Sequence, residues 1–239
     1  MTAIRINELT KAYDGKVVLD IPSLEIPSGQ LVGLVGNNGA GKTTLLRLTL
    51  DLIGATTGQV LSEGLDVAQS EEWKSYTGSF LDRHFLIDFY TVEEYFALIA
   101  ELYGIAPAEM EERLEPFMPL MHDELLGQRK FIRDFSEGNR QKIGIIGAMF
   151  IRPRVLLLDE PFNYLDPSSQ IIVARLIAQQ CELYGTTVII SSHNLNSVAD
   201  ISHRILLLEH GRILHDLMNH DSSAFDVLHE YFNMDTDVM

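Results

Sequence analysis

The chain has 239 residues, of which 46% are hydrophobic and 22% charged, so it is long enough for one large domain with a substantial buried core. Its 18 basic and 34 acidic residues give a net charge of −16, which argues against non-specific binding to nucleic acid or anionic lipid, since both need clustered basic residues. The single cysteine, Cys181, excludes an internal disulfide and fits a reducing cytosol. The start of the chain is too polar for a signal peptide, and no apolar run approaches the roughly 20 residues of a membrane span.

The first thirty residues alternate apolar and polar side chains between early turn signals, which predicts short antiparallel strands. The run "QLVGLVG" then predicts a buried strand, which passes through a glycine-rich loop into the helical pattern of "KTTLLRLTLDLIG". Further on, "GSFLD" predicts another strand.

From about Tyr90 to Arg152 the pattern is helical. Apolar side chains recur every three or four residues in "TVEEYFALIAELYG", which predicts an amphipathic helix closed by Gly104. Pro107 begins a second helix, and Pro116 limits its length. A helix from about Asn139 is predicted to follow "FSEG".

The last third returns to alternating strands and helices. "VLLLDE", "TTVIISSH" and "HRILLLEHGRIL" predict strands, with helices over "PSSQIIVARLIAQQCELYG" and "NLNSVAD". This order implies a parallel sheet with helices on both faces, into which the helical segment is inserted.

One motif indicates a phosphate site. "GNNGAGKTT" lies between the predicted buried strand and its helix, the context in which G-x-x-x-x-G-K-[ST] binds nucleotide phosphates. Backbone N–H groups would surround the phosphates, the lysine would reach the terminal ones, and the first threonine would bind Mg²⁺. The residues concerned are Gly36, Asn37, Asn38, Gly39, Ala40, Gly41, Lys42, Thr43 and Thr44.

A second motif, "VLLLDEP", places two acids at the carboxyl end of a buried strand, where parallel sheets bind ligands. Asp159 is positioned to hold Mg²⁺, and Glu160 to polarise an attacking water. Alone the pattern is weak, because many strands end in an acid, but it follows a phosphate loop.

In this order the motifs resemble those of the ATP-binding-cassette (ABC) ATPases, and the likeness covers nearly the whole chain. The resemblance implies that Tyr13 stacks on adenine, Glu160 is catalytic, His193 in "SSH" contacts the γ-phosphate, and "FSEGN" is the signature segment. It also implies a head-to-tail dimer, homomeric or heteromeric, in which Ser136 and Gly138 of one copy face the ATP of the other. Asp166 in "NYLDP" is expected to cap the next helix, and the resemblance adds a dimer contact. Plainer roles remain open: Tyr13 at a sheet edge, and His193 in a solvated loop.

The implied fold class is α/β: a P-loop NTPase (RecA-like) core with an N-terminal antiparallel β-subdomain and an inserted α-helical subdomain. Residues 1–82 and 153–239 would form the core of one domain, and about 83–152 the helical signature subdomain. ATP and Mg²⁺ are the implied substrate and cofactor. The helical segment looks most like exporter ATPases of the ABC-2 type, and we expect no appended regulatory domain after "SSAFDVLHEYF". An integral-membrane permease is the implied partner, with the chain peripheral on the cytoplasmic face of a bacterial cell membrane.

Two departures from the family pattern bear on turnover. Asp82 stands where the family has a Mg²⁺-binding glutamine, so Asp82 becomes a candidate metal ligand of altered geometry. The signature reads LSGGQ in the family and "FSEGN" here, so that Phe135 replaces the leucine, Glu137 the first glycine and Asn139 the glutamine. We expect slowed hydrolysis that survives both changes. The alternatives are a cytosolic ABC ATPase without transport, an ATP-gated dimer with impaired hydrolysis and, more remotely, a nucleotide kinase that shares only the phosphate loop.

Overall fold

The structure is a computed structural model that describes residues 1–121, 124–219 and 228. The segment "SSAFDVLHEYF" lies outside these ranges apart from Leu228, which is buried. In chain order the elements are β1 Thr2–Tyr13, β2 Lys16–Pro27, β3 Leu31–Val35, α1 Lys42–Thr49, β4 Thr57–Ser62, β5 Leu65–Asp66, η1 Glu72–Tyr76, β6 Thr77–Phe80, η2 Arg83–Phe85, α2 Val92–Leu102, α3 Pro107–Leu114, η3 Glu115–Phe117, α4 Met118–Met121, η4 Ile132–Asp134, α5 Glu137–Met149, β7 Val155–Asp159, α6 Pro167–Tyr184, β8 Thr187–Ser192, α7 Asn196–Ala199, β9 Arg204–Glu209 and β10 Arg212–Met218.

The strands form two sheets. The first is antiparallel with the order β2-β1-β4-β5, and the second has the order β10-β9-β3-β8-β7-β6. In the second sheet β9, β3, β8, β7 and β6 are parallel, and only β10 runs antiparallel to its neighbour. This mixed α/β architecture confirms the predicted fold class. The boundaries 1–82, 83–152 and 153–239 stay our proposal for the division of the chain.

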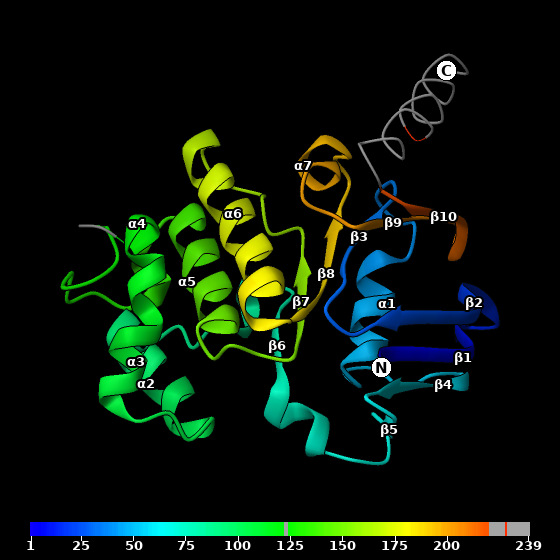
Figure 1. Ribbon diagram of the computed structural model, residues 1–239, viewed down its shortest axis with the longest axis horizontal. Helices are drawn as coiled ribbons and strands as arrows, with labels where there is room; N and C mark the ends of the chain where they lie inside the picture. The colour runs from blue at the N-terminus through cyan, green and yellow to red at the C-terminus, as the bar shows by residue number, and fades with distance from the viewer. Residues whose placement is uncertain (122–123, 220–227, 229–239) are drawn as a thin grey trace.

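Both faces of the second sheet are covered, as Figure 1 shows. Alternate strand residues, among them Leu31, Val35 and Leu158, belong to the core shared with α5, α6 and α7. The intervening residues, such as Val32 and Leu157, belong to the core shared with α1 and the first sheet. Because side chains alternate along a strand, such continuous apolar runs are expected only where both faces are buried.

Three details differ from the sequence predictions. Strands β1 and β2 have twelve residues each and are not short, because they pair along almost their whole length despite two irregularities in register. "HRILLLEHGRIL" is a hairpin of two strands, since His210 and Gly211 have φ of 45° and 80°, the left-handed geometry of a two-residue turn. Strands β4 and β5 had no counterpart among the predicted elements.

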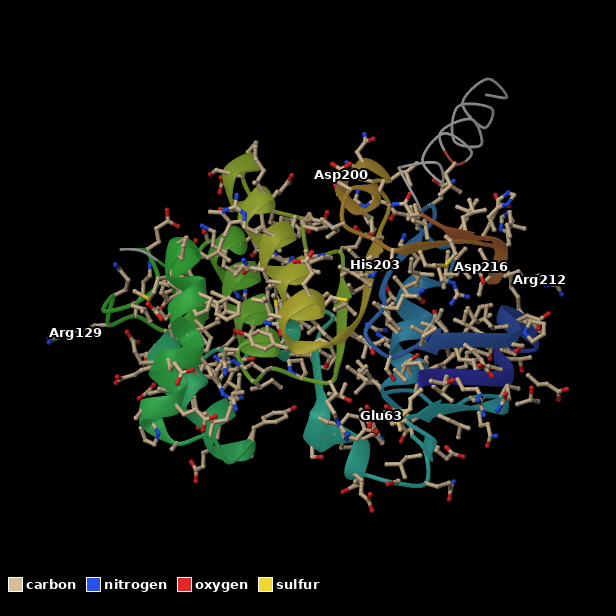
Figure 2. The ribbon with its side chains drawn as sticks, viewed as in Figure 1. Glu63, Arg129, Asp200, His203, Arg212 and Asp216 are labelled. Carbon is tan, nitrogen blue, oxygen red and sulfur yellow. The ribbon has the colours of Figure 1, made fainter. Side chains whose placement is uncertain are left out.

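Polar contacts tie the β9–β10 hairpin to the first sheet. Arg212 pairs with Asp20 of β2 at 2.7 Å, and Figure 2 shows Arg212 and Asp216 on the side of the molecule where the two sheets meet. Arg204 binds both carboxylate oxygens of Asp216 and also donates to the Glu25 carbonyl of β2 at 2.7 Å. The hairpin therefore fixes the first sheet beside the phosphate loop.

Within the helical segment, helices α2 and α3 begin and end where the sequence predicts, and α5 begins earlier. Helix α2 begins with a capping box between Thr91 and Glu94, and Gly104 follows its end with φ +67°. Helix α5 begins at Glu137 and not near Asn139, because the Ser136 side chain caps it by accepting from the Asn139 N–H. In the part of the chain described, no helix is both long and apolar enough to span a membrane.

Candidate functional site

The phosphate loop joins β3 to α1. Gly41 takes φ +109°, which a residue with a side chain rarely adopts, and no side chain caps the helix that begins at Lys42. The open N-terminus of α1 therefore faces the loop with its N–H groups and its positive dipole end. Lys42 is only 6% exposed, and its ammonium donates to the Gly36 carbonyl at 2.6 Å. A chain segment of this geometry binds phosphate.

Asp159, at the end of β7, is a buried carboxylate beside the loop. Its Oδ2 accepts from the Thr43 hydroxyl at 2.5 Å, and Oδ1 accepts from the Ser191 hydroxyl. Burial raises the pKa of Asp159 although both hydroxyls lower it, and the nearby Glu160 carboxylate raises it further. The hydroxyl oxygen of Thr43 and the carboxylate oxygens of Asp159 lie next to each other, and such hard oxygen ligands suit Mg²⁺.

Glu160 follows Asp159 with φ +48°, in the left-handed region that non-glycine residues seldom occupy. Its backbone N–H donates to both oxygens of Ser191, and its carbonyl accepts from the Gln141 side chain at 3.1 Å. The carboxylate lies 3.5 Å from Lys42 Nζ and 2.9 Å from His193 Nδ1. The turn at Glu160 thus directs its carboxylate to the lysine of the loop and to the histidine after β8.

A cleft of about 350 Å³ opens over these groups. Its walls include Tyr13 from the end of β1, Val18 from β2, and Glu160. Tyr13 is half exposed, and the ammonium of Lys11 lies 4.8 Å from its ring centroid. The other lining residues come from the phosphate loop: Asn38, Gly39, Ala40, Gly41, Lys42, Thr43 and Thr44. An aromatic ring and a phosphate loop that line one cleft suit a nucleotide.

Asp82 follows β6, which pairs with β7, so it lies beyond the same edge of the sheet as Asp159. Its carboxylate accepts from the His84 N–H and lies 2.6 Å from His84 Nδ1. Partial burial raises its pKa, but the bonds and charge of His84 outweigh that effect and leave the pKa below its usual value. The role of Asp82 as a metal ligand stays a prediction, since its carboxylate hydrogen-bonds to His84 and, in the described part of the chain, not to the residues around Asp159.

The signature segment forms a separate group of residues. Ser136 is exposed and caps α5, and neither it nor Gly138 lines the cleft that holds the phosphate loop. Asp166 caps α6 as predicted: it accepts from the Ser169 N–H at 3.0 Å, with Pro167 as the first helical residue. Bonds from the hydroxyls of Ser168 and Ser169 lower the pKa of Asp166.

Sequence reasoning missed three contributors to the site. Val18, which belongs to no recognisable motif, lines the cleft. The Ser191 hydroxyl donates to the Asp159 carboxylate, and the Gln141 side chain donates to the Glu160 carbonyl. The contact of Ser191 could have been predicted from the sequence, because Ser191 lies directly beside Asp159 when β7 and β8 are neighbouring strands. Nothing in the sequence near Val18 or Gln141 indicates these contacts.

Comparisons with known proteins agree with this geometry. A family model described as ABC transporter matches residues 19–163. "Uncharacterized ABC transporter ATP-binding protein YcbN" of Bacillus subtilis (strain 168) is 31% identical over 91% of this chain and 70% of its own length. "Probable sulfate/thiosulfate import ATP-binding protein CysA" of Chlorella vulgaris is 29% identical over 93% of this chain and 96% of its own length. The solved "Structure of ATP binding subunit of ABC transporter" superposes with a TM-score of 0.82 at 27% identity, covering 97% of this chain and 94% of that one.

Proposed function

The chain belongs to the ABC transporter family as an ATP-hydrolysing subunit, and from this premise we propose that it powers a separate membrane permease by working as a head-to-tail dimer. The observation that carries the proposal is the placement of Glu160. Its carboxylate lies within reach of Lys42, the phosphate-loop lysine, and of His193, in a cleft that also contains an exposed aromatic ring.

The residues of the cleft divide the work of ATP hydrolysis between them. Tyr13 stacks on the base, the N–H groups at the start of α1 bind the phosphates, and Lys42 neutralises their charge. Glu160 accepts a proton from the attacking water as a general base. His193 holds the Glu160 carboxylate and would contact the terminal phosphate. Thr43 and Asp159 would hold Mg²⁺, which when bound offsets the negative charge that develops on the phosphate oxygens.

The dimer is part of the proposal because one chain does not complete the site. Ser136, which caps α5, and Gly138 lie at the N-terminus of that helix, whose positive dipole end favours an anion, yet both lie outside their own chain's cleft. In a head-to-tail pair, each signature segment would face the ATP held by the other copy. Asp166, at the start of α6, would lie in the contact between copies.

The permease is a separate chain in this proposal, and the ATPase lies against it on the cytoplasmic face of the membrane. We propose export as the direction, on the resemblance of the helical segment to exporter subunits. The Chlorella vulgaris relative is named for import. Transport assays in vesicles that contain the permease and this chain would therefore measure the direction in which the substrate moves.

The test of the catalytic assignment is Glu160→Gln. The variant keeps the shape of the side chain but removes the base, so kcat for phosphate release is expected to fall by about 10²-fold or more. ATP binding, followed with a fluorescent analogue and Mg²⁺, is expected to persist, and the protein should accumulate as a dimer in light scattering.

Glu182→Gln is the matched control, because it removes the same charge from an exposed position near the end of α6. Its turnover is expected to equal that of the parent. A Glu160→Gln protein that hydrolyses ATP at the parental rate would refute the role of Glu160, and a parent without Mg²⁺-dependent turnover would refute hydrolysis itself.

A further inference from the structure

Arg83, the first residue of η2, contacts two segments that are distant from it in sequence. Its guanidinium is ion-paired with Glu137, the acid that replaces a glycine of the signature, and its carbon Cζ lies 4.2 Å from the ring centroid of Tyr164. Tyr164 belongs to the loop between Glu160 and α6. Only 20% of the Arg83 side chain is exposed, so its charge depends on these partners.

A second arginine completes this cluster. Arg140, 17% exposed, donates to Asp88 at 2.9 Å and to the Arg83 carbonyl at 3.5 Å, and lies 4.0 Å from Glu137. Two largely buried cations therefore share the carboxylates of Glu137 and Asp88. Removing Glu137 would leave Arg83, only 20% exposed, without its paired carboxylate, while Arg140 would keep Asp88.

The same segments are also close through the backbone. A Cβ on Gly138 would lie 2.7 Å from the Tyr164 carbonyl, nearer than real contacts allow, so only glycine fits there. Tyr164 itself has φ +65°, a conformation that the surrounding contacts must hold in place. One turn further along α5, Gln141 donates to the Glu160 carbonyl. The start of α5 is thus packed against the loop that leaves Glu160.

We propose that Arg83 is a positioning residue: through Glu137 and Tyr164 it fixes the signature segment relative to the loop that follows Glu160. The inference rests on the proposed function, in which the signature faces the ATP of a second copy. It also assigns the Glu137 charge to a bond within its own chain, so that the acid is directed to Arg83 and not to a phosphate. Replacing Glu137 with the family's glycine should then lower turnover, because Arg83 loses its carboxylate.

The experiment is a double-mutant cycle on the full chain. Arg83→Ala and Glu137→Gly are each expected to lower kcat for ATP hydrolysis about tenfold, and the double variant is expected to lose no more than either single one. The Kd of a fluorescent ATP analogue, measured with protein dilute enough to stay monomeric, should change less than about twofold, since neither residue lines the cleft. The exchanged pair, R83E with E137R, should recover at least half of the lost rate.

Arg152→Ala is the matched control. Arg152 is also a partly buried arginine with one carboxylate, Glu112 at 3.3 Å, and one aromatic ring, Tyr184 at 4.9 Å, but it lies away from the signature. Its loss is expected to leave kcat unchanged. A similar fall in kcat for Arg152→Ala would mean that the effect reflects general stability and would overturn the positioning role.

The outcomes separate the inference from the proposed function. A parent that hydrolyses ATP while the two substitutions act additively, or while Glu137→Gly raises kcat, overturns the role of Arg83 alone. A parent that hydrolyses no ATP overturns the proposed function and the inference with it. Weaker nucleotide binding in Arg83→Ala would also count against the inference, since it predicts an effect on the signature and none on the cleft.

Discussion

At the scale of single residues, Asp159 shows a conflict between stability and function. It is 8% exposed, and its two hydrogen-bond partners, Thr43 and Ser191, are uncharged hydroxyls. Because burial raises its pKa, the folded chain binds the Asp159 proton at a higher pH than the unfolded chain does. Folding stability therefore decreases as pH rises through this range, and the ionised carboxylate destabilises the ligand-free protein at neutral pH.

This argument predicts that Asp159→Asn stabilises the protein in the absence of Mg²⁺ and ATP. We expect its Tm at pH 7 to exceed that of the parent by about 2–4 °C, the shift that ~1 kcal/mol produces in a domain of this size. The difference should shrink near pH 4, where more of the parent's Asp159 is protonated. With Mg²⁺ and ATP added, the parent should gain more stability than the variant, which lacks the metal-binding carboxylate. Thermal unfolding followed by circular dichroism is the measurement. A variant with a lower Tm than the parent at pH 7 would contradict the claim that the ionised Asp159 carboxylate destabilises the ligand-free protein.

At the scale of elements, two glycines of α5 allow the helix to lie close against β6 and against α2. A Cβ on Gly144 would come within 2.0 Å of the Phe80 ring, and one on Gly147 within 3.1 Å of both Ile99 and Tyr95. Helix α5 carries the signature at its start, and the segment after β6 carries Asp82 and Arg83. The close approach of helix and strand therefore sets the distance across which Arg83 meets Glu137.

Gly144→Ala is accordingly expected to destabilise the fold by about 1–3 kcal/mol, the usual cost of overpacking, and to reduce turnover by moving the signature. Gly54→Ala is the matched control, because a Cβ there meets open space and φ is not positive. Its effect should stay within about 0.5 kcal/mol. Urea unfolding of the two variants makes the comparison; equal stabilities would show that the contact with Phe80 is not tight.

At the scale of the whole molecule, the composite site can be tested by mixing inactive chains. Lys42→Ala disables the phosphate loop, and Ser136→Asp disables the signature while keeping a good helix cap. In a head-to-tail dimer of the two variants one site is intact, so an equal mixture should regain about a quarter of the parental ATPase rate if the chains pair randomly. The rate of phosphate release before and after mixing is the measurement.

A second mixture serves as the control. Lys42→Ala and Glu160→Gln affect the same half-site, so their mixed dimers contain no intact site and should stay inactive. Recovery in this control, or none in the first mixture, would contradict the head-to-tail arrangement. With no recovery in the first mixture, each site would have to be built from one chain, and recovery in the control would place Glu160 and the phosphate loop of one site on different chains.

Features that depend on local chemistry could be predicted from the order of residues. The phosphate loop between β3 and α1, the acids at the end of β7 and the Asp166 cap were readable, because residue type and spacing alone require them. Strand order, the β9–β10 hairpin and the length of β1 and β2 were decided by pairing between distant segments, which no local pattern specifies.

The role of Glu137, the unusual acid of the signature, depends on contacts that form only when the chain folds. In the sequence, Glu137 is an acid beside an anion-binding helix end, and its charge could be directed to Arg140, to solvent or to a phosphate. In the folded chain Arg83, more than fifty residues earlier, pairs with it, and Tyr164 covers the arginine. The electrostatic role of a charge depends on its neighbours in space, and these neighbours come together only when β6, α5 and the loop after β7 are packed side by side.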